Sequence, residues 1–194
     1  MTATLAFCVG LRGDELRPRL VGDTLRVTSP NQRLLVGRPL ESLKNGSTVT
    51  FDFGLVALNE TRLVQARTAE RFVFSYDLWA ERFSVVQLTA KDVRQSRASV
   101  ANVSGTNVSV ANLPADAAEQ WCLERLVLPS TALDRARPLR LRLEIRADEP
   151  RRGNGKADPP ISLATLIDLF SSPARREQRL WVLETSPFRL DTLK

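Results

Sequence analysis

The stretch LRLRLEIRA, residues 139–147, alternates apolar and charged side chains without a break. Its apolar positions are Leu139, Leu141, Leu143 and Ile145, and its charged positions are Arg140, Arg142, Glu144 and Arg146. Successive side chains of a β-strand point to opposite faces. This period of two therefore predicts a strand with one face in the core and one face turned outward.

The same alternation recurs in residues 47–58, and residues 62–79 and 82–88 are rich in strand-forming side chains. Because short turns separate these segments, we expect antiparallel pairing. The sequence predicts a mainly β fold, an antiparallel β-sandwich or a distorted barrel, with two or three short helices. The expected core includes Phe51, Phe53, Phe72, Phe74, Leu141, Leu143 and Trp181.

Turn-forming residues delimit the remaining predicted strands. Gly22 and Asp23 predict a hairpin over Leu16–Thr28. Residues 62–79 form one strand, or two strands broken by a bulge near Ala69. Residues 99–102 and 109–112 both read SVAN and predict the two arms of one hairpin. Further strands are expected at 179–185 and 188–193.

Three segments predict helices: residues 38–44, residues 115–125 with Pro114 in the first turn, and residues 161–171. The wide apolar arc of the last helix favours packing on the sheet, with a groove or a membrane surface as the alternative. Residues 148–160 are polar and rich in Pro and Gly, which predicts a mobile loop within a single domain spanning residues 1–194.

Composition restricts the chemistry. Histidine is absent, which excludes every Ser-His-Asp and Cys-His mechanism. No nucleotide-binding loop is present, and the two cysteines, Cys8 and Cys122, belong to no metal-binding pair, so we expect no cofactor and no metal site. Both cysteines are expected to be buried thiols, and a disulfide between them requires an oxidising compartment.

The net charge of +6 rests on 24 arginines and four lysines. Seven arginines fall within eighteen residues: Arg135, Arg137, Arg140, Arg142, Arg146, Arg151 and Arg152. Two interpretations stay open: a binding surface for an acidic protein or an anionic lipid surface, or a solvated outer face. Nucleic acid is less favoured, since no aromatic side chains are interleaved for base stacking.

These observations favour a non-enzymatic binding or protein-interaction module with a basic strand face for an anionic partner. The alternatives are an anionic-lipid-binding protein and an enzyme that uses Asp, Glu, Tyr or Lys chemistry.

The order of elements also resembles a known group of proteins. The segment Leu40–Gly46 leads into Thr48–Phe53, followed by the pair Phe74–Asp77 and Arg82–Val85 and the Leu/Arg strand near residue 140. This order resembles an uncharacterised bacterial family of exported, β-rich domains of unknown function. The resemblance implies residence in the bacterial envelope, with the cytoplasm as the alternative, and implies no activity or site residues.

Overall fold

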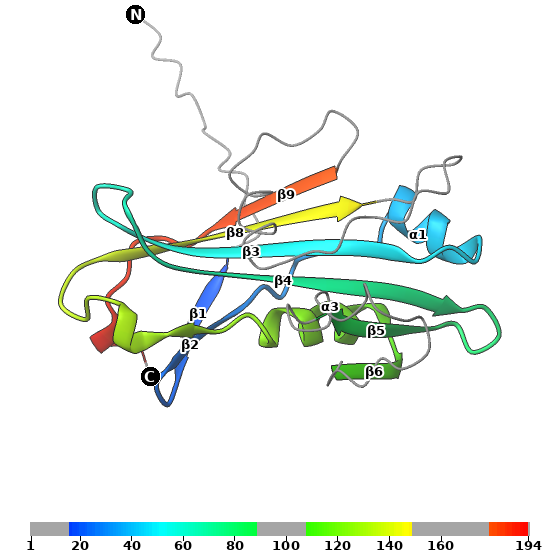
Figure 1. Cartoon of the computed structure of the whole chain (residues 1–194), viewed down its shortest axis with the longest axis horizontal. Coiled ribbons are helices and arrows are strands. Elements are labelled where there is room, and N and C mark those ends of the chain that lie inside the picture. Colours follow the sequence, from blue (N-terminus) through cyan, green and yellow to red (C-terminus); the bar gives the residue numbers. More distant parts are fainter. Residues whose placement is uncertain (1–15, 89–107, 149–178, 194) are drawn as a thin grey trace, which may run out of the picture.

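The computed structural model describes residues 16–88, 108–148 and 179–193, whose strands form two antiparallel sheets (Figure 1). The larger sheet has the strand order β6-β5-β4-β3-β8-β9, and the smaller sheet has the order β1-β2-β7. The strands are β1 (Arg17–Val21), β2 (Thr24–Thr28), β3 (Val49–Asn59), β4 (Val64–Asp77), β5 (Arg82–Leu88), β6 (Val108–Leu113), β7 (Leu128–Pro129), β8 (Leu139–Asp148) and β9 (Arg179–Glu184). The predicted mainly β, antiparallel fold is confirmed. Neither sheet closes into a barrel over the described residues, so the sandwich-like alternative holds.

Two of the predicted helices are confirmed, as α1 (Arg38–Lys44) and α3 (Ala115–Glu124). The end of α1 follows from its sequence, since Gly46 lies just beyond it with a φ of +80°, a left-handed conformation that favours glycine. Pro114 is the extended N-cap of α3, not a first-turn residue. The predicted helix at 161–171 lies outside the described residues, as does the predicted loop at 148–160 apart from its first residue, Asp148, which ends β8.

Of the two alternatives for residues 62–79, one long strand is confirmed, and the predicted strand at 188–193 is wrong. The irregularity in the β3–β4 pairing falls between Ala57 and Leu58, opposite the start of β4, and β4 runs unbroken past Ala69. Residues 188–193 form no strand. Phe188 makes a single bridge to Leu139, and a short 3-10 helix, η2 (Leu190–Thr192), follows.

The second SVAN copy lies in β6, which pairs with β5, and the first copy lies outside the described residues. A second 3-10 turn, η1 (Ser130–Ala132), follows β7.

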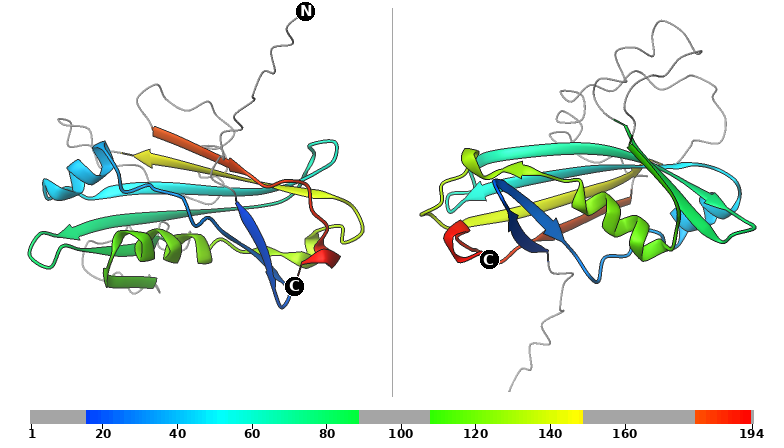
Figure 2. Two further views of the ribbon diagram at one scale, coloured as in Figure 1. Left: turned by 180° about the vertical axis from the view of Figure 1, so that it is seen from behind. Right: turned by 90° about the horizontal axis from the view of Figure 1, so that it is seen from below.

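The core lies between the larger sheet and a second layer formed by the β1–β2 hairpin and α3 (Figure 2). In β3 and β4 the core is aromatic: Phe51 packs edge-on against Phe74, and Phe53 against Phe72, with ring centroids 5.1 and 5.0 Å apart. Six of the seven predicted core residues are fully buried. The seventh, Trp181, is only partly buried and packs at the margin of the core against Phe51.

Candidate functional site

The larger sheet has an outer face, opposite the core, and it carries the predicted basic row. Arg140, Arg142 and Arg146 alternate with buried residues along β8 and share this face, as the sequence predicts. Arg135 and Arg137 lie in the loop before β8, where they are exposed and approach Asp23 and Asp134. Arg151 and Arg152 lie outside the described residues. The structure therefore brings together three of the seven predicted arginines.

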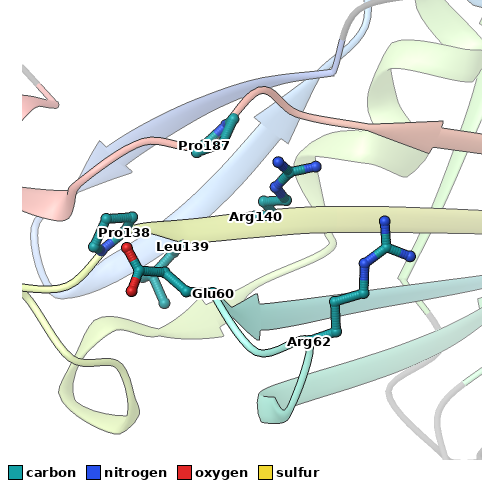
Figure 3. Close-up of a pocket in the computed structure, with 6 residues that line it drawn as sticks. All are labelled: Glu60, Arg62, Pro138, Leu139, Arg140 and Pro187. Atoms are coloured by element: carbon teal, nitrogen blue, oxygen red, sulfur yellow. The ribbon is translucent and has the colours of Figure 1, made fainter.

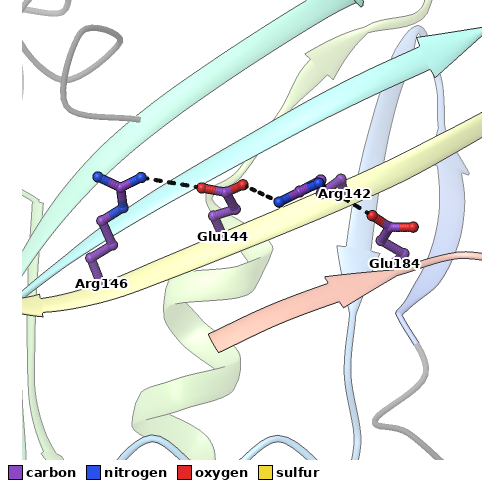
Figure 4. Close-up of polar contacts among 4 residues, drawn as sticks. All are labelled: Arg142, Glu144, Arg146 and Glu184. Carbon is purple, nitrogen blue, oxygen red and sulfur yellow. Dashed lines mark hydrogen bonds and ion pairs between the residues drawn. The ribbon is translucent and has the colours of Figure 1, made fainter. Parts of the chain in front are cut away.

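Acidic side chains pair with two of these three arginines (Figure 4). Arg142 contacts Glu144 at 2.8 Å and Glu184 of β9 at 3.6 Å. Arg146 contacts the same Glu144 at 3.4 Å, and only 4% of its side chain is exposed. Two guanidinium groups and two carboxylates thus form a charge-balanced chain across β8 and β9. Arg142 and Arg146, two members of the predicted row, are therefore engaged in ion pairs.

A second ion pair extends the charged outer face into β3. Asp52 stands between Arg146 of β8 and Arg71 of β4 in the strand register. Arg71 donates two hydrogen bonds to the carboxylate, the one from its terminal nitrogen measuring 2.7 Å. Only 1% of Asp52 is exposed. Burial raises the pKa of Asp52, and the hydrogen bond and charge of Arg71 oppose that rise.

Arg140 differs from its two neighbours, because it lines a pocket at the end of the sheet (Figure 3). The pocket has a volume of about 340 Å³ and is lined by Glu60, Arg62, Pro138, Leu139, Arg140 and Pro187. The guanidinium groups of Arg62 and Arg140 point to the same side. Neither makes a hydrogen bond or ion pair with any residue that the structure describes. We call this feature the Arg62–Arg140 pocket.

The β3–β4 turn positions Arg62. The Asn59 side chain accepts a hydrogen bond from the backbone N–H of Leu63 at 2.8 Å, and Arg62 adopts a left-handed conformation with a φ of +60°. Hairpin turns of this kind favour glycine at the left-handed position. The sequence therefore places a long cationic side chain where a turn preference alone would select glycine. No pattern in the sequence connected Arg62 with Arg140, since 78 positions separate them.

The chemistry of this pocket suits anion binding. A guanidinium group offers a planar fork of donors that matches a carboxylate or a phosphate. Glu60 is the one carboxylate among the lining residues, and Pro138, Leu139 and Pro187 supply apolar walls. The lining contains no nucleophile next to a base, the arrangement that covalent catalysis requires. Among the residues that the structure describes, no group of three or more potential ligands could hold a metal ion.

Two buried titratable groups on α3, Glu119 and Cys122, belong to the interior of the protein. Glu119 accepts the backbone N–H groups of Leu34 and Leu35, each at 2.9 Å, and so fixes the loop after β2. Burial raises the pKa of Glu119, and these two hydrogen bonds oppose the rise. Burial also raises the pKa of the Cys122 thiol well above its ordinary value, so this thiol is a poor nucleophile. Cys8, its predicted alternative partner, lies outside the described residues.

Comparisons with known proteins found no matching family model, no similar curated protein and no similar solved structure. The resemblance to an exported bacterial family stays a prediction. Over the described residues, no helix has the length and apolar character needed to cross a membrane.

Proposed function

We propose that the protein is a non-enzymatic binding protein that holds an anionic group of its partner in the Arg62–Arg140 pocket. The observation that carries this proposal is that two arginines line one pocket and that neither guanidinium group makes an ion pair with a described residue, although the Glu60 carboxylate also lines the pocket. The proposal narrows the predicted basic surface, because the Glu144 carboxylate already occupies Arg142 and Arg146. Among the three arginines of β8, Arg140 is the one that makes no ion pair with a described residue.

The size of the pocket supports a small anionic group on a larger partner. A volume of about 340 Å³ lies near the lower end of small-molecule sites, which span roughly 300–1,000 Å³. Both guanidinium groups can donate to a carboxylate or a phosphate, and Pro138, Leu139 and Pro187 supply apolar lining beside them. Hydrogen bonds between charged groups strengthen when water is excluded.

The test is calorimetric titration of the full chain at low salt with two probes, a polyglutamate peptide and inorganic phosphate. We expect binding that the double variant Arg62→Ala/Arg140→Ala weakens by about tenfold or more, since each charge-assisted hydrogen bond contributes about 1.5–3 kcal/mol. The matched control is Arg17→Ala/Arg19→Ala, which removes two exposed charges from β1 in the other sheet.

Both double variants lose two positive charges, so they have the same net charge. The control therefore distinguishes binding at the Arg62–Arg140 pocket from attraction by the net charge of the protein. Equal weakening by both double variants would show attraction by net charge alone and would overturn the proposal. If neither the polyglutamate peptide nor inorganic phosphate binds, the proposal is overturned as well. If polyglutamate binds and phosphate does not, the partner group is a carboxylate.

A further inference from the structure

The β4–β5 turn exposes two consecutive large apolar side chains. Leu78 is 57% exposed and Trp79 is 98% exposed. The two other tryptophans, Trp121 and Trp181, are packed against the core. Exposure of a whole indole ring forgoes the burial that usually stabilises a tryptophan, and tryptophan is enriched at interfaces and in membrane-interface belts, where one end of the ring is apolar and the other is polar.

The turn presents these side chains on a fixed support. The Asp77 carboxylate accepts hydrogen bonds from the backbone N–H groups of Trp79 and Ala80, at 2.9 and 3.1 Å. Glu81 closes the turn in the left-handed conformation, with a φ of +53°. At the base of the turn, Tyr76 packs against Phe83 with ring centroids 4.8 Å apart. A turn held in this way loses little conformational entropy when its tip is bound.

We propose that the Leu78–Trp79 tip inserts into the headgroup region of a lipid bilayer. The argument from area favours a bilayer over a protein partner. A stable protein interface buries at least about 1,000 Å² in total, whereas this tip offers two apolar side chains at a narrow turn. A bilayer needs no complementary surface, and tryptophan concentrates at the level of the headgroups because its ring is apolar and its N–H is polar.

The charges beside the tip determine the kind of bilayer. Asp77 and Glu81 carry two negative charges, and Arg82 carries one positive charge. These residues do not attract an anionic surface. Insertion of the tip therefore depends on apolar burial, which makes it insensitive to salt and independent of anionic lipid.

The tip is separate from the Arg62–Arg140 pocket, so this inference does not rest on the proposed function. The two features lie at opposite ends of β4 (Figure 1). The strand has 14 residues, which at about 3.3 Å per residue corresponds to roughly 45 Å. One membrane anchor of this size gives weak, reversible binding.

The experiment measures cosedimentation of the full chain with vesicles of zwitterionic phosphatidylcholine. We expect the variant Leu78→Ser/Trp79→Ser to lower the partition coefficient by about tenfold or more, because it removes both inserted side chains. The matched control is Leu63→Ser/Val64→Ser, which removes two exposed apolar side chains from the turn at the other end of β4. The control variant is expected to bind as the unmodified protein does.

A second measurement locates the indole ring. Lipids brominated on their acyl chains are expected to quench the tryptophan fluorescence of the bound protein. The conservative variant Trp79→Phe should keep binding and lose that quenching, since Trp121 and Trp181 are packed against the core. Three outcomes overturn the proposal: no binding to phosphatidylcholine, binding that survives Leu78→Ser/Trp79→Ser, or binding that requires anionic lipid and disappears with salt. Binding that requires anionic lipid and disappears with salt would show that arginines, and not the Leu78–Trp79 tip, bind the membrane.

Discussion

The two faces of the larger sheet are built by the same strands and are stabilised in different ways. On the core face, β3 and β8 present Phe51, Phe53, Leu141 and Leu143, all fully buried. On the outer face, the same strands present two acids, Asp52 and Glu144, and two arginines, Arg142 and Arg146. Glu144 contacts both arginines, and Asp52 lies opposite Arg146 in the strand register. The core face needs only apolar burial, whereas the outer face needs each buried charge to have a partner.

This difference teaches that a charged side of a strand is not necessarily a solvated side. Asp52 and Arg146 are as inaccessible as the phenylalanines of the core. A buried charge pays a desolvation cost, which a well-aligned partner offsets. On the outer face, Arg71 of β4 stabilises the buried Asp52 through an ion pair. On the core face, Phe72, the next residue along β4, packs against Phe53.

The largest expected effect comes from the core face. We expect Phe53→Ala to lower the free energy of unfolding by about 3–5 kcal/mol, because it removes a ring that packs edge-on against Phe72 and leaves a cavity. Urea unfolding followed by circular dichroism measures this loss. Val56→Ala, a change to the outer face of the same strand, should cost clearly less. Equal losses would show that the two faces are equally packed.

The next effect comes from the outer face. Asp52→Ala should lower the free energy of unfolding by about 3 kcal/mol, since it leaves the Arg71 guanidinium largely buried without its carboxylate. The double variant Asp52→Ala/Arg71→Met should recover part of that loss, because both charges are then removed. If the double variant is less stable than Asp52→Ala, the charge of Arg71 is not the cause.

A smaller effect is expected at the centre of the charged chain. Glu144→Gln should cost about 1–2 kcal/mol, because Glu144 contacts both Arg142 and Arg146. Arg142→Gln should cost less than 1 kcal/mol, since more than a third of that side chain is exposed and solvent screens its ion pairs. Urea unfolding measures the free energy of unfolding of both variants. A greater loss of stability from Arg142→Gln than from Glu144→Gln would contradict this prediction.

The smallest effect concerns the one acid that faces the core from β4. Glu70 stands opposite Phe53 and accepts a hydrogen bond from Gln87 at 3.0 Å. Burial raises the pKa of Glu70, so the folded state holds this proton more firmly than the unfolded state. Stability from this group is therefore fully present below the ordinary pKa and is lost as the pH rises through the raised value.

The variant Glu70→Gln tests this linkage. Urea unfolding from about pH 4 to about pH 7 should show a flatter decline of stability for the variant than for the unmodified protein. Asp52 and Glu119 shift in the same direction, so some decline should remain. An identical pH dependence of the two proteins would show that Glu70 is not perturbed by burial.

The alternation of side chains determined most of the fold. It placed Phe51 and Phe53 in the core and Arg140, Arg142 and Arg146 on one outer face, because the period of a strand is a local property of the backbone. Glycine and asparagine after Lys44 likewise fixed the end of α1. The sequence did not determine the end of the chain, where Phe188 makes one bridge instead of a strand.

Only the tertiary structure decided which charges are paired and which are available. The sequence lists seven arginines between residues 135 and 152, but Glu184 and Asp52 reach this row through strand order and register, which depend on contacts far apart in the chain. The same contacts bring Arg62 beside Arg140 across the end of the sheet. Local patterning thus decides the face on which a side chain lies, and the neighbouring strands decide whether its charge is neutralised there or left to bind a partner.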